Sequence, residues 1–235
     1  MKSIHFENID STNTYLKNNY EHLDDQTFVS VNNQTNGKGR NTRTWISEDS
    51  KNLLFSLLLK NNLEHYQELS IISAYSIIKV LEKYNLKDLM IKWPNDVYVR
   101  DSKICGILLE GISTDRLLCL IIGIGLNVNQ DTFEGEYLTK PTSMKLELHK
   151  DIDINTLKKE VYQSLIDNIN KLNNGYNFYE DISKYDYLVN KEVYATINNK
   201  KERVKVIKIN EDYSLRIILN NTELNINSGE ISFHI

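Results

Sequence analysis

The 235-residue sequence has little of what marks secreted, membrane-spanning or multi-linker proteins. Its two cysteines, Cys105 and Cys119, both lie in apolar runs, which indicates buried, reduced thiols of a cytoplasmic protein. It has two prolines and nine glycines, so long flexible linkers are not expected. The apolar runs have the length of strands and are too short to cross a bilayer. We therefore expect a cytoplasmic protein with no membrane partner.

The sequence also lacks a surplus of basic residues. Lys and Arg number 28 against 32 Asp and Glu, which gives a net charge of −4. General nucleic-acid binders usually carry a basic surplus, so no nucleic-acid partner is expected. The five histidines are scattered, and no His or Cys spacing indicates zinc. With 40% hydrophobic and 26% charged residues, the chain has the composition of a folded globular protein.

The first three quarters of the chain alternate irregularly between helix and strand patterns. The spacing of apolar residues predicts strands at residues 4–8, 28–32, 53–59, 90–93, 97–100, 104–110 and 117–124. It predicts helices at residues 11–22, 65–84, 155–173 and 178–185, and Ser11 can N-cap the first of them. We expect an α+β domain over residues 1–186, in which a mixed β-sheet packs with helices.

The last fifty residues have a different pattern. Five short strands are predicted at residues 193–197, 203–209, 214–219, 223–226 and 230–233, separated by Asn-rich turns. From Asp186 onward, seven basic residues are offset by seven acidic ones. This pattern predicts a small β-barrel over residues 187–235. Its balanced charge favours a docking or lid module over a nucleic-acid binder.

A basic, glycine-containing loop follows the second predicted strand, at residues 34–45. Residues 26–47 contain no acidic side chain, while Lys38, Arg40 and Arg43 supply three cations. The two glycines allow close backbone approach to an anion such as a phosphate or carboxylate. The spacing is not that of a Walker A loop, and a solvated basic loop is the alternative.

The segment Lys-Trp-Pro-Asn-Asp at residues 92–96 leads into a predicted hairpin. It leaves the carboxylate of Asp96 at a strand end, close to Lys103 at the start of the returning strand. We expect the Lys103 side chain to share a face with three apolar residues of that strand, Cys105, Ile107 and Leu109. A lysine in this place suits a phosphoryl group, and Gly106 leaves room for a ligand. A solvent-facing hairpin is the alternative.

Two further patterns each have a structural and a functional interpretation. Residues 123–129 begin like a dinucleotide fingerprint, but Val128 replaces its third glycine, which excludes a Rossmann site. Asn127, at the end of that strand, can still bond a flat base, or simply end the strand. The polar residues 11–13 can bind a neutral head group, or simply cap the helix.

Taken together and in order, these motifs resemble the catalytic domain of biotin–protein ligases. The motifs are Ser-Thr-Asn at 11–13, Gly-Lys-Gly-Arg…Trp at 37–45, Lys-Trp-Pro-Asn-Asp…Lys…Gly at 92–106 and Gly…Gly-Leu-Asn at 123–127. The similarity runs from about residue 4 to the C-terminus. It implies a class II synthetase-like catalytic domain followed by an SH3-like barrel. The basic loop departs from the family pattern at Lys38, which keeps the charge of an arginine, and at Thr42, which replaces a glycine.

The resemblance implies an ATP-dependent ligase. Such an enzyme forms biotinyl-5′-AMP from biotin and ATP with Mg²⁺, then transfers biotin to a lysine of a biotin carboxyl carrier protein. A homodimer is compatible with the family. Some members carry an N-terminal helix-turn-helix domain and repress transcription. Ten residues precede Ser11, too few for such a domain, so the expectation is the monofunctional form.

The resemblance also implies roles for individual residues. The catalytic residues would be Lys103, Arg40 and Asp96, with Asp96 also a Mg²⁺ ligand. The biotin-binding residues would be Ser11, Thr12, Asn13, Gln34, Lys38, Gly39, Arg40, Lys103 and Gly106. The ATP- or adenylate-binding residues would be Lys38, Arg40, Arg43, Trp45, Asn95, Lys103 and Asn127.

Two alternatives remain open. A lipoate–protein ligase has a similar fold and the same adenylation chemistry, but the dithiolane of lipoate has no ureido group for the polar residues 11–13 and Gln34 to bond. A non-catalytic module whose barrel recruits a partner leaves the combination of Arg40, Asp96 and Lys103 unexplained.

Overall fold

The computed structural model describes residues 2–40, 43–48, 50–135, 137–197, 200–227 and 231–234, the last four by their backbone. Some features expected from the sequence lie outside these ranges: residues 41–42 of the basic loop, the turn at 198–199, residues 228–229 and Glu230 at the start of the last predicted strand.

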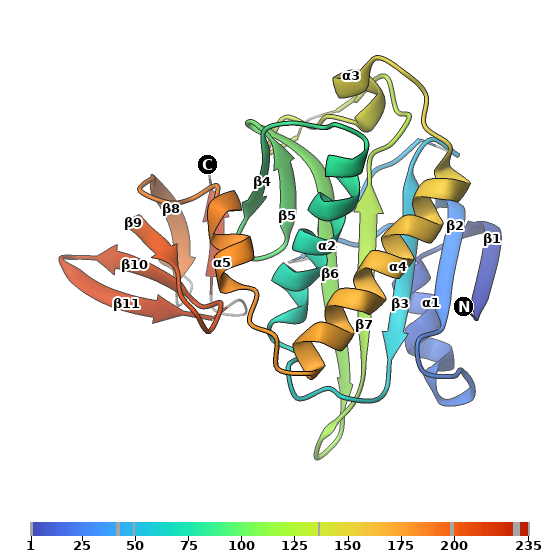
Figure 1. The fold of residues 1–235 in the computed structure, drawn as a ribbon, viewed down its shortest axis with the longest axis horizontal. Helices are drawn as coiled ribbons and strands as arrows, with labels where there is room; N and C mark the ends of the chain where they lie inside the picture. Colours follow the sequence, from blue (N-terminus) through green and yellow to red (C-terminus); the bar gives the residue numbers. More distant parts are fainter. Residues whose placement is uncertain are drawn as a thin grey trace.

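A seven-stranded mixed sheet forms the larger part of the molecule, with the spatial order β1-β2-β3-β7-β6-β5-β4 (Figure 1). Its strands are β1 (Ser3–Ile9), β2 (Phe28–Gln34), β3 (Leu53–Leu59), β4 (Leu89–Lys92), β5 (Asp96–Val99), β6 (Ser102–Ser113) and β7 (Leu117–Leu126). β1 and β2 are parallel, and the other neighbouring strands are antiparallel. The predicted α+β class with a mixed sheet is confirmed.

Helices cover both faces of this sheet. α2 (Leu69–Lys83) and α4 (Ile154–Asn173) lie against one face, and α1 (Thr12–Asn19) packs on the other (Figure 1). β3 has alternating side chains that serve both layers: Phe55 and Leu57 join the core under α2 and α4, whereas Leu58 joins the cluster under α1. The complete burial of β3 therefore follows from its central position between two helical layers.

A second, antiparallel sheet of five strands follows, in the order β11-β10-β9-β8-β12. Its strands are β8 (Glu192–Ile197), β9 (Lys200–Ile209), β10 (Leu215–Leu219), β11 (Thr222–Ile226) and β12 (Ile231–His234). It lies beyond β4 at one end of the molecule (Figure 1). The small C-terminal β module is confirmed, and its sheet is consistent with an SH3-like domain. The boundary at residues 186/187 stays a prediction, because the second sheet begins only at Glu192.

The two parts of the molecule contact each other at the Lys-Trp-Pro-Asn-Asp segment. Trp93 is 2% exposed, and its Nε1 donates a hydrogen bond of 2.9 Å to the backbone oxygen of Tyr213 in the β9–β10 turn. On the next residue, the carbonyl of Pro94 accepts a bond of 3.1 Å from the hydroxyl of Ser70 on α2. The chain that precedes Asn95 and Asp96 is therefore anchored from two sides.

Several helix boundaries differ from the prediction. α2 begins at Leu69, because residues 65–68 form tight turns. α1 ends at Asn19 and continues as one 3₁₀ turn, η1 (Tyr20–His22). The last predicted helix divides into α5 (Tyr179–Ile182) and η2 (Ser183–Tyr185). The prediction missed α3 (Met144–Leu148), a single turn that Ser143 caps by accepting from the amide of Leu146.

The predicted N-cap at Ser11 is confirmed, since its hydroxyl accepts from the amide of Thr14. Within the described ranges, no helix combines the length and apolarity that crossing a membrane requires.

We predict that Leu165→Ala destabilises the fold by about 2–5 kcal/mol, because this side chain of α4 is fully buried in the main hydrophobic core. Leu146→Ala is the matched control: this leucine on α3 is 40% exposed, and its truncation should change stability by no more than about 0.5 kcal/mol. Urea unfolding followed by circular dichroism measures both. Equal effects of the two substitutions would contradict the assigned packing of α4.

Candidate active site

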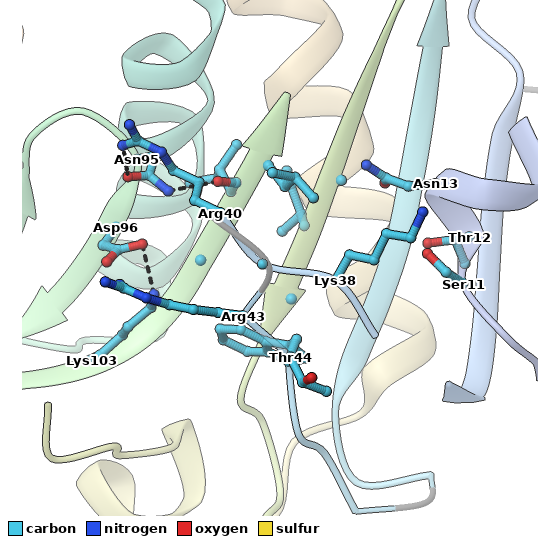
Figure 2. Close-up of a pocket in the computed structure, with 18 of the residues that line it drawn as sticks. Ser11, Thr12, Asn13, Lys38, Arg40, Arg43, Thr44, Asn95, Asp96 and Lys103 are labelled. Atoms are coloured by element: carbon cyan, nitrogen blue, oxygen red, sulfur yellow. Dashed lines mark hydrogen bonds and ion pairs between the residues drawn. The ribbon is translucent and has the colours of Figure 1, made fainter. Parts of the chain in front are cut away.

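A cavity of about 170 Å³ lies on the face of the larger sheet that also carries α1. Figure 2 shows Ser11, Thr12 and Asn13 at one side, Asn95, Asp96 and Lys103 at the other, and Lys38 and Arg40 of the basic loop between them. Most of the predicted site residues line it: Ser11, Thr12, Asn13, Gln34, Lys38, Gly39, Arg40, Arg43, Trp45, Asn95, Asp96, Lys103 and Gly106. The structure thus brings together segments that are far apart in sequence, from residues 11–13 to residues 95–106.

The α1 side of the cavity is a network of neutral polar groups. The amide of Thr12 donates to Gln34 Oε1 at 2.9 Å, and the Thr12 hydroxyl donates to the same oxygen at 3.1 Å. Thr12 Oγ1 also lies 2.6 Å from the hydroxyl of Ser56 on β3. Ser56 in turn donates to Asn13 Oδ1. Thr12, Asn13 and Ser56 are each at most 4% exposed, so the network is rigid and suited to a neutral polar ligand.

The floor of the cavity is flat because glycines lie opposite each other on neighbouring strands. Gly106 on β6 pairs with Gly125 on β7, and the indole of Trp45 lies against both. A Cβ atom at Gly125 would be 2.4 Å from Trp45 Cε2, and one at Gly106 would be 2.8 Å from Cζ3. The Nε1 of Trp45 is buried and has no hydrogen-bond partner within the described part of the chain. Side chains at either glycine would displace the indole.

The basic loop folds back on itself as an irregular hairpin. The amide of Trp45 donates to the oxygen of Gly37 at 2.9 Å, and the amide of Gly39 donates to the oxygen of Arg43 at 2.7 Å. Lys38 forms an isolated antiparallel bridge with Thr44. These bonds direct the cations of the loop into the cavity (Figure 2).

Arg40 connects this loop to the turn before β5. Its Nη1 donates a bond of 3.1 Å to Asn95 Oδ1, while Asn95 Nδ2 donates to the oxygen of Ile107 at 2.8 Å. The Asn95 side chain is thereby held from two sides. Burial lowers the pKa of Arg40, and the nearby charge of Asp96 acts against this shift. An arginine stays charged at neutral pH in such surroundings, so Arg40 is a preorganised cation.

Lys103 and Asp96 form an ion pair, with 2.7 Å between Nζ and Oδ1. The Lys103 ammonium also lies 5.5 Å from the centre of the Trp45 ring. The predicted face of Lys103 is wrong. The register of β5 and β6 shifts between Val97 and Tyr98, so Ile104 is an extra residue, a β-bulge. The bulge turns Lys103 to the face of Gly106, where a Cβ would lie 3.2 Å from Lys103 Cε.

Lys92 is a lining residue to which the sequence analysis gave no role. It is 9% exposed, and burial lowers its pKa, although the charge of Asp96 partly opposes this. Its place within the Lys-Trp-Pro-Asn-Asp motif was the available signal. The described lining of the cavity therefore holds five cationic residues, Lys38, Arg40, Arg43, Lys92 and Lys103, against one carboxylate, Asp96. This arrangement attracts anions.

A second cavity, of about 430 Å³, adjoins the first. The two share the lining residues Arg43, Thr44, Trp45, Lys92, Asp96 and Lys103. The second cavity extends to Asn127 and to apolar side chains that the sequence analysis did not identify, Ile46, Phe133, Tyr137, Leu138 and Pro141. Asn127 is 4% exposed, and its Nδ2 donates to the oxygen of Thr142 at 3.0 Å. Arg43, Lys92 and Lys103 therefore lie where a polar cavity and a more apolar one meet.

The described residues contain no group of three or more His, Cys, Asp or Glu side chains that could cage a metal ion. Asp96 is the carboxylate among the described linings of both cavities. Mg²⁺ that enters with a nucleotide is usually held by one or two carboxylates together with the phosphates. The donor set therefore fits Mg²⁺ bound with a phosphorylated substrate. The role of each site residue stays a prediction.

The chain matches the family model described as biotin/lipoate A/B protein ligase family over residues 5–127, which is more than half of its length. It is 35% identical over 132 residues to the bifunctional ligase/repressor BirA of Bacillus spizizenii, a match covering 54% of this chain and 41% of that protein. With BirA of Escherichia coli it shares 30% identity over 160 residues, or 67% of this chain and 50% of that protein. The matches thus span half or less of these relatives.

Among solved structures, the fold is similar to that of a biotin protein ligase from Aquifex aeolicus in complex with biotin and ATP. The TM-score is 0.88 at 29% sequence identity, and the alignment covers 99% of this chain and 98% of the other. With a family match over more than half of the sequence and the same architecture over nearly all of it, the chain belongs to the biotin/lipoate A/B protein ligase family.

Proposed function

We propose that this protein is an ATP-dependent biotin–protein ligase that acts on a biotin carboxyl carrier protein. The observation that carries the proposal is the meeting of the two cavities at Lys92, Lys103, Arg43 and Asp96. A ligand with a neutral polar head fits the first cavity and a nucleotide fits the second. Their anionic ends then meet among the cations.

In the first half-reaction, a carboxylate oxygen of biotin attacks the α-phosphorus of ATP. A C–O–P bond forms, the bond from the α-phosphorus to the pyrophosphate oxygen breaks, and pyrophosphate leaves. The attack brings two anions together, so the main contribution of the protein is alignment and charge neutralisation. Lys103 is the cation placed between the reacting groups. Arg43 and Lys92 lie with it where the two cavities meet, and Arg40 and Lys38 reach the phosphate from the first cavity. When bound, Mg²⁺ offsets phosphate charge, with Asp96 as its protein ligand.

In the second half-reaction, the ε-amine of the carrier lysine attacks the carbonyl of the mixed anhydride. An amide bond forms, the amine nitrogen releases one proton to solvent, the bond between the acyl carbon and the AMP oxygen breaks, and AMP leaves. This step needs no nucleophile from the enzyme. Arg40 and Lys103 keep the adenylate phosphate in place until the carrier arrives. The reaction takes place in the cytoplasm, where the two buried thiols stay reduced.

The polar side of the first cavity favours biotin over lipoate. The ureido group of biotin carries N–H donors and a carbonyl acceptor, which match the hydroxyl and amide groups of Ser11, Thr12, Asn13 and Gln34. Lipoate carries an apolar dithiolane at this position, which offers these polar groups neither a donor nor an acceptor, so it lacks the hydrogen bonds that biotin makes here.

The direct test is biotin-dependent exchange of labelled pyrophosphate into ATP. We expect exchange with biotin and none with lipoate, because exchange requires reversible formation of the adenylate. Exchange with lipoate alone would identify a lipoate ligase. Absence of exchange with either acid would favour a non-catalytic binding module and contradict the proposal.

Lys103→Ala should lower the rate of biotinyl-adenylate formation by roughly 10²–10³-fold, by analogy with the loss of one preorganised donor. Lys103 lies at the start of β6 and is partly exposed, so its truncation removes little packing. Lys140→Ala is the control, since this exposed lysine does not line the cavity. Single-turnover adenylate formation by both variants measures the effect. A folded Lys103→Ala protein with a near-normal rate would refute the role of Lys103.

Arg40→Gly should weaken retention of the adenylate more than its formation. Arg40 lies in the basic loop over the cavity and contacts Asn95, whereas Lys103 lies at the reacting centre. Removing Arg40 should therefore loosen the basic loop before it slows the chemical step. Adenylate that escapes acylates accessible amines. The variant should therefore biotinylate serum albumin in a mixture, which biotin blotting detects. Arg116→Ala, at an exposed arginine of the β6–β7 hairpin, is the control. Adenylate retention equal to that of the unmodified protein would contradict this prediction.

A further inference from the structure

Glu110 lies on β6 behind the polar side of the first cavity and is not among the residues that line it. Its Oε2 accepts a hydrogen bond of 2.8 Å from Asn13 Nδ2 on α1. Its Oε1 is 4.0 Å from the ammonium of Lys17, one helical turn further along α1. The Glu110 side chain is 23% exposed, against 52% for Lys17. The contact with Asn13 is therefore the shielded one of the two.

Side chains of two strands, Glu110 on β6 and Ser56 on β3, determine the orientation of the Asn13 amide. A carboxylate can only accept hydrogen bonds, so Glu110 requires the NH₂ end of Asn13 to face it. Ser56 on β3 donates its hydroxyl to the opposite end, Asn13 Oδ1. The amide also lies directly against β7, where a Cβ on Gly123 would be 2.2 Å from Oδ1. A side-chain amide alone has two orientations of nearly the same shape, and these contacts select one.

We propose that Glu110 is a positioning residue for ligand specificity: it holds Asn13 Nδ2 so that Asn13 Oδ1 accepts a ureido N–H of biotin. This inference rests on the proposed function. A carbonyl oxygen has two lone pairs, and Ser56 uses one of them. The other is left for a ligand donor, since Asn13 lines the cavity. Glu110 thereby selects ligands that carry a hydrogen-bond donor opposite Asn13 Oδ1, without contacting the ligand itself.

The same contacts extend the effect to Thr12. The hydroxyl of Ser56 lies 2.6 Å from Thr12 Oγ1, and Thr12 bonds to Gln34 through both its amide and its hydroxyl. If Asn13 turned over, its NH₂ group would face the Ser56 hydroxyl, and the hydrogen-bond directions of the whole network would change. An uncharged Glu110→Gln side chain permits this, because a glutamine amide can either donate to Asn13 or accept from it.

The test compares the unmodified protein with Glu110→Gln, using calorimetric titration with biotin. We expect the Kd for biotin to rise about five- to tenfold, the loss typical of one buried hydrogen bond. The KM for ATP and kcat at saturating biotin should not change. Lys17→Met is the matched control: it removes the exposed partner of Glu110 but keeps the bond to Asn13, and should bind biotin like the unmodified protein.

A second readout separates positioning from general structural damage. Biotin is compared with its two analogues that carry a methyl group on one ureido nitrogen. The unmodified protein should discriminate against the analogue whose methyl group replaces the hydrogen facing Asn13. In Glu110→Gln, the ratio of the affinity for biotin to the affinity for this analogue should shrink. A merely structural effect would weaken the binding of both ligands equally and leave the ratio unchanged. An unchanged Kd or an unchanged ratio overturns the inference.

Two controls keep the outcome unambiguous. If the unmodified protein does not bind biotin, the proposed function fails, independently of Glu110. If Glu110→Gln does not fold, as judged by circular dichroism, Glu110→Ala takes its place, because it removes the acceptor of Asn13 Nδ2. It should also shrink the ratio of affinities, and an unchanged ratio in Glu110→Ala would overturn the inference.

Discussion

Mutual repulsion among cations is the constraint on which the arrangement of this site depends. Lys92, Lys103, Arg40 and Arg43 are gathered around Asp96, the one carboxylate among the described lining residues, and burial lowers the pKa of Lys92 and Arg40. Such a cluster opposes folding unless rigid neighbours hold it. Here the rigid neighbours are the turn before β5, which Trp93 and Ser70 anchor, the hydrogen-bonded basic loop, and the bulged strand β6. The cluster is therefore least favourable when empty and most favourable when anions enter, which is the property a site for joining two anions needs.

The sheet gives this cluster its geometry. β6 and β7 are paired along most of their length, so Gly106 and Gly125 meet to leave a flat space for Trp45, and Gly123 leaves space for Asn13. These glycines lie on the face opposite α2 and α4. One face of the same strands thus builds the core, and the other lines the first cavity.

Much of the fold was predictable because its signals are local. The apolar run of β3 and the helical spacing of α4 each indicated the correct element, and residues of the four separated motifs line two adjoining cavities. The face of Lys103 was not predictable, because the bulge at Ile104 arises from pairing with β5 and leaves no mark in an alternation pattern. The roles of Ser56 and Glu110 were hidden for a similar reason: each becomes informative only once α1 lies across β3 and β6.

The hydrogen bond from Trp93 to the carbonyl of Tyr213 makes the second sheet part of the frame that holds the turn at Asn95 and Asp96. That carbonyl is offered by a turn in which Tyr213 has a positive φ of 63°, so its position depends on the exact length of the β9–β10 connection. An unrelated barrel grafted in place of this one would have to reproduce a backbone acceptor at the same point. For protein engineering, the two parts of this chain are therefore not interchangeable modules: their junction is a matched pair, and homologous replacements should exchange both sides of it together.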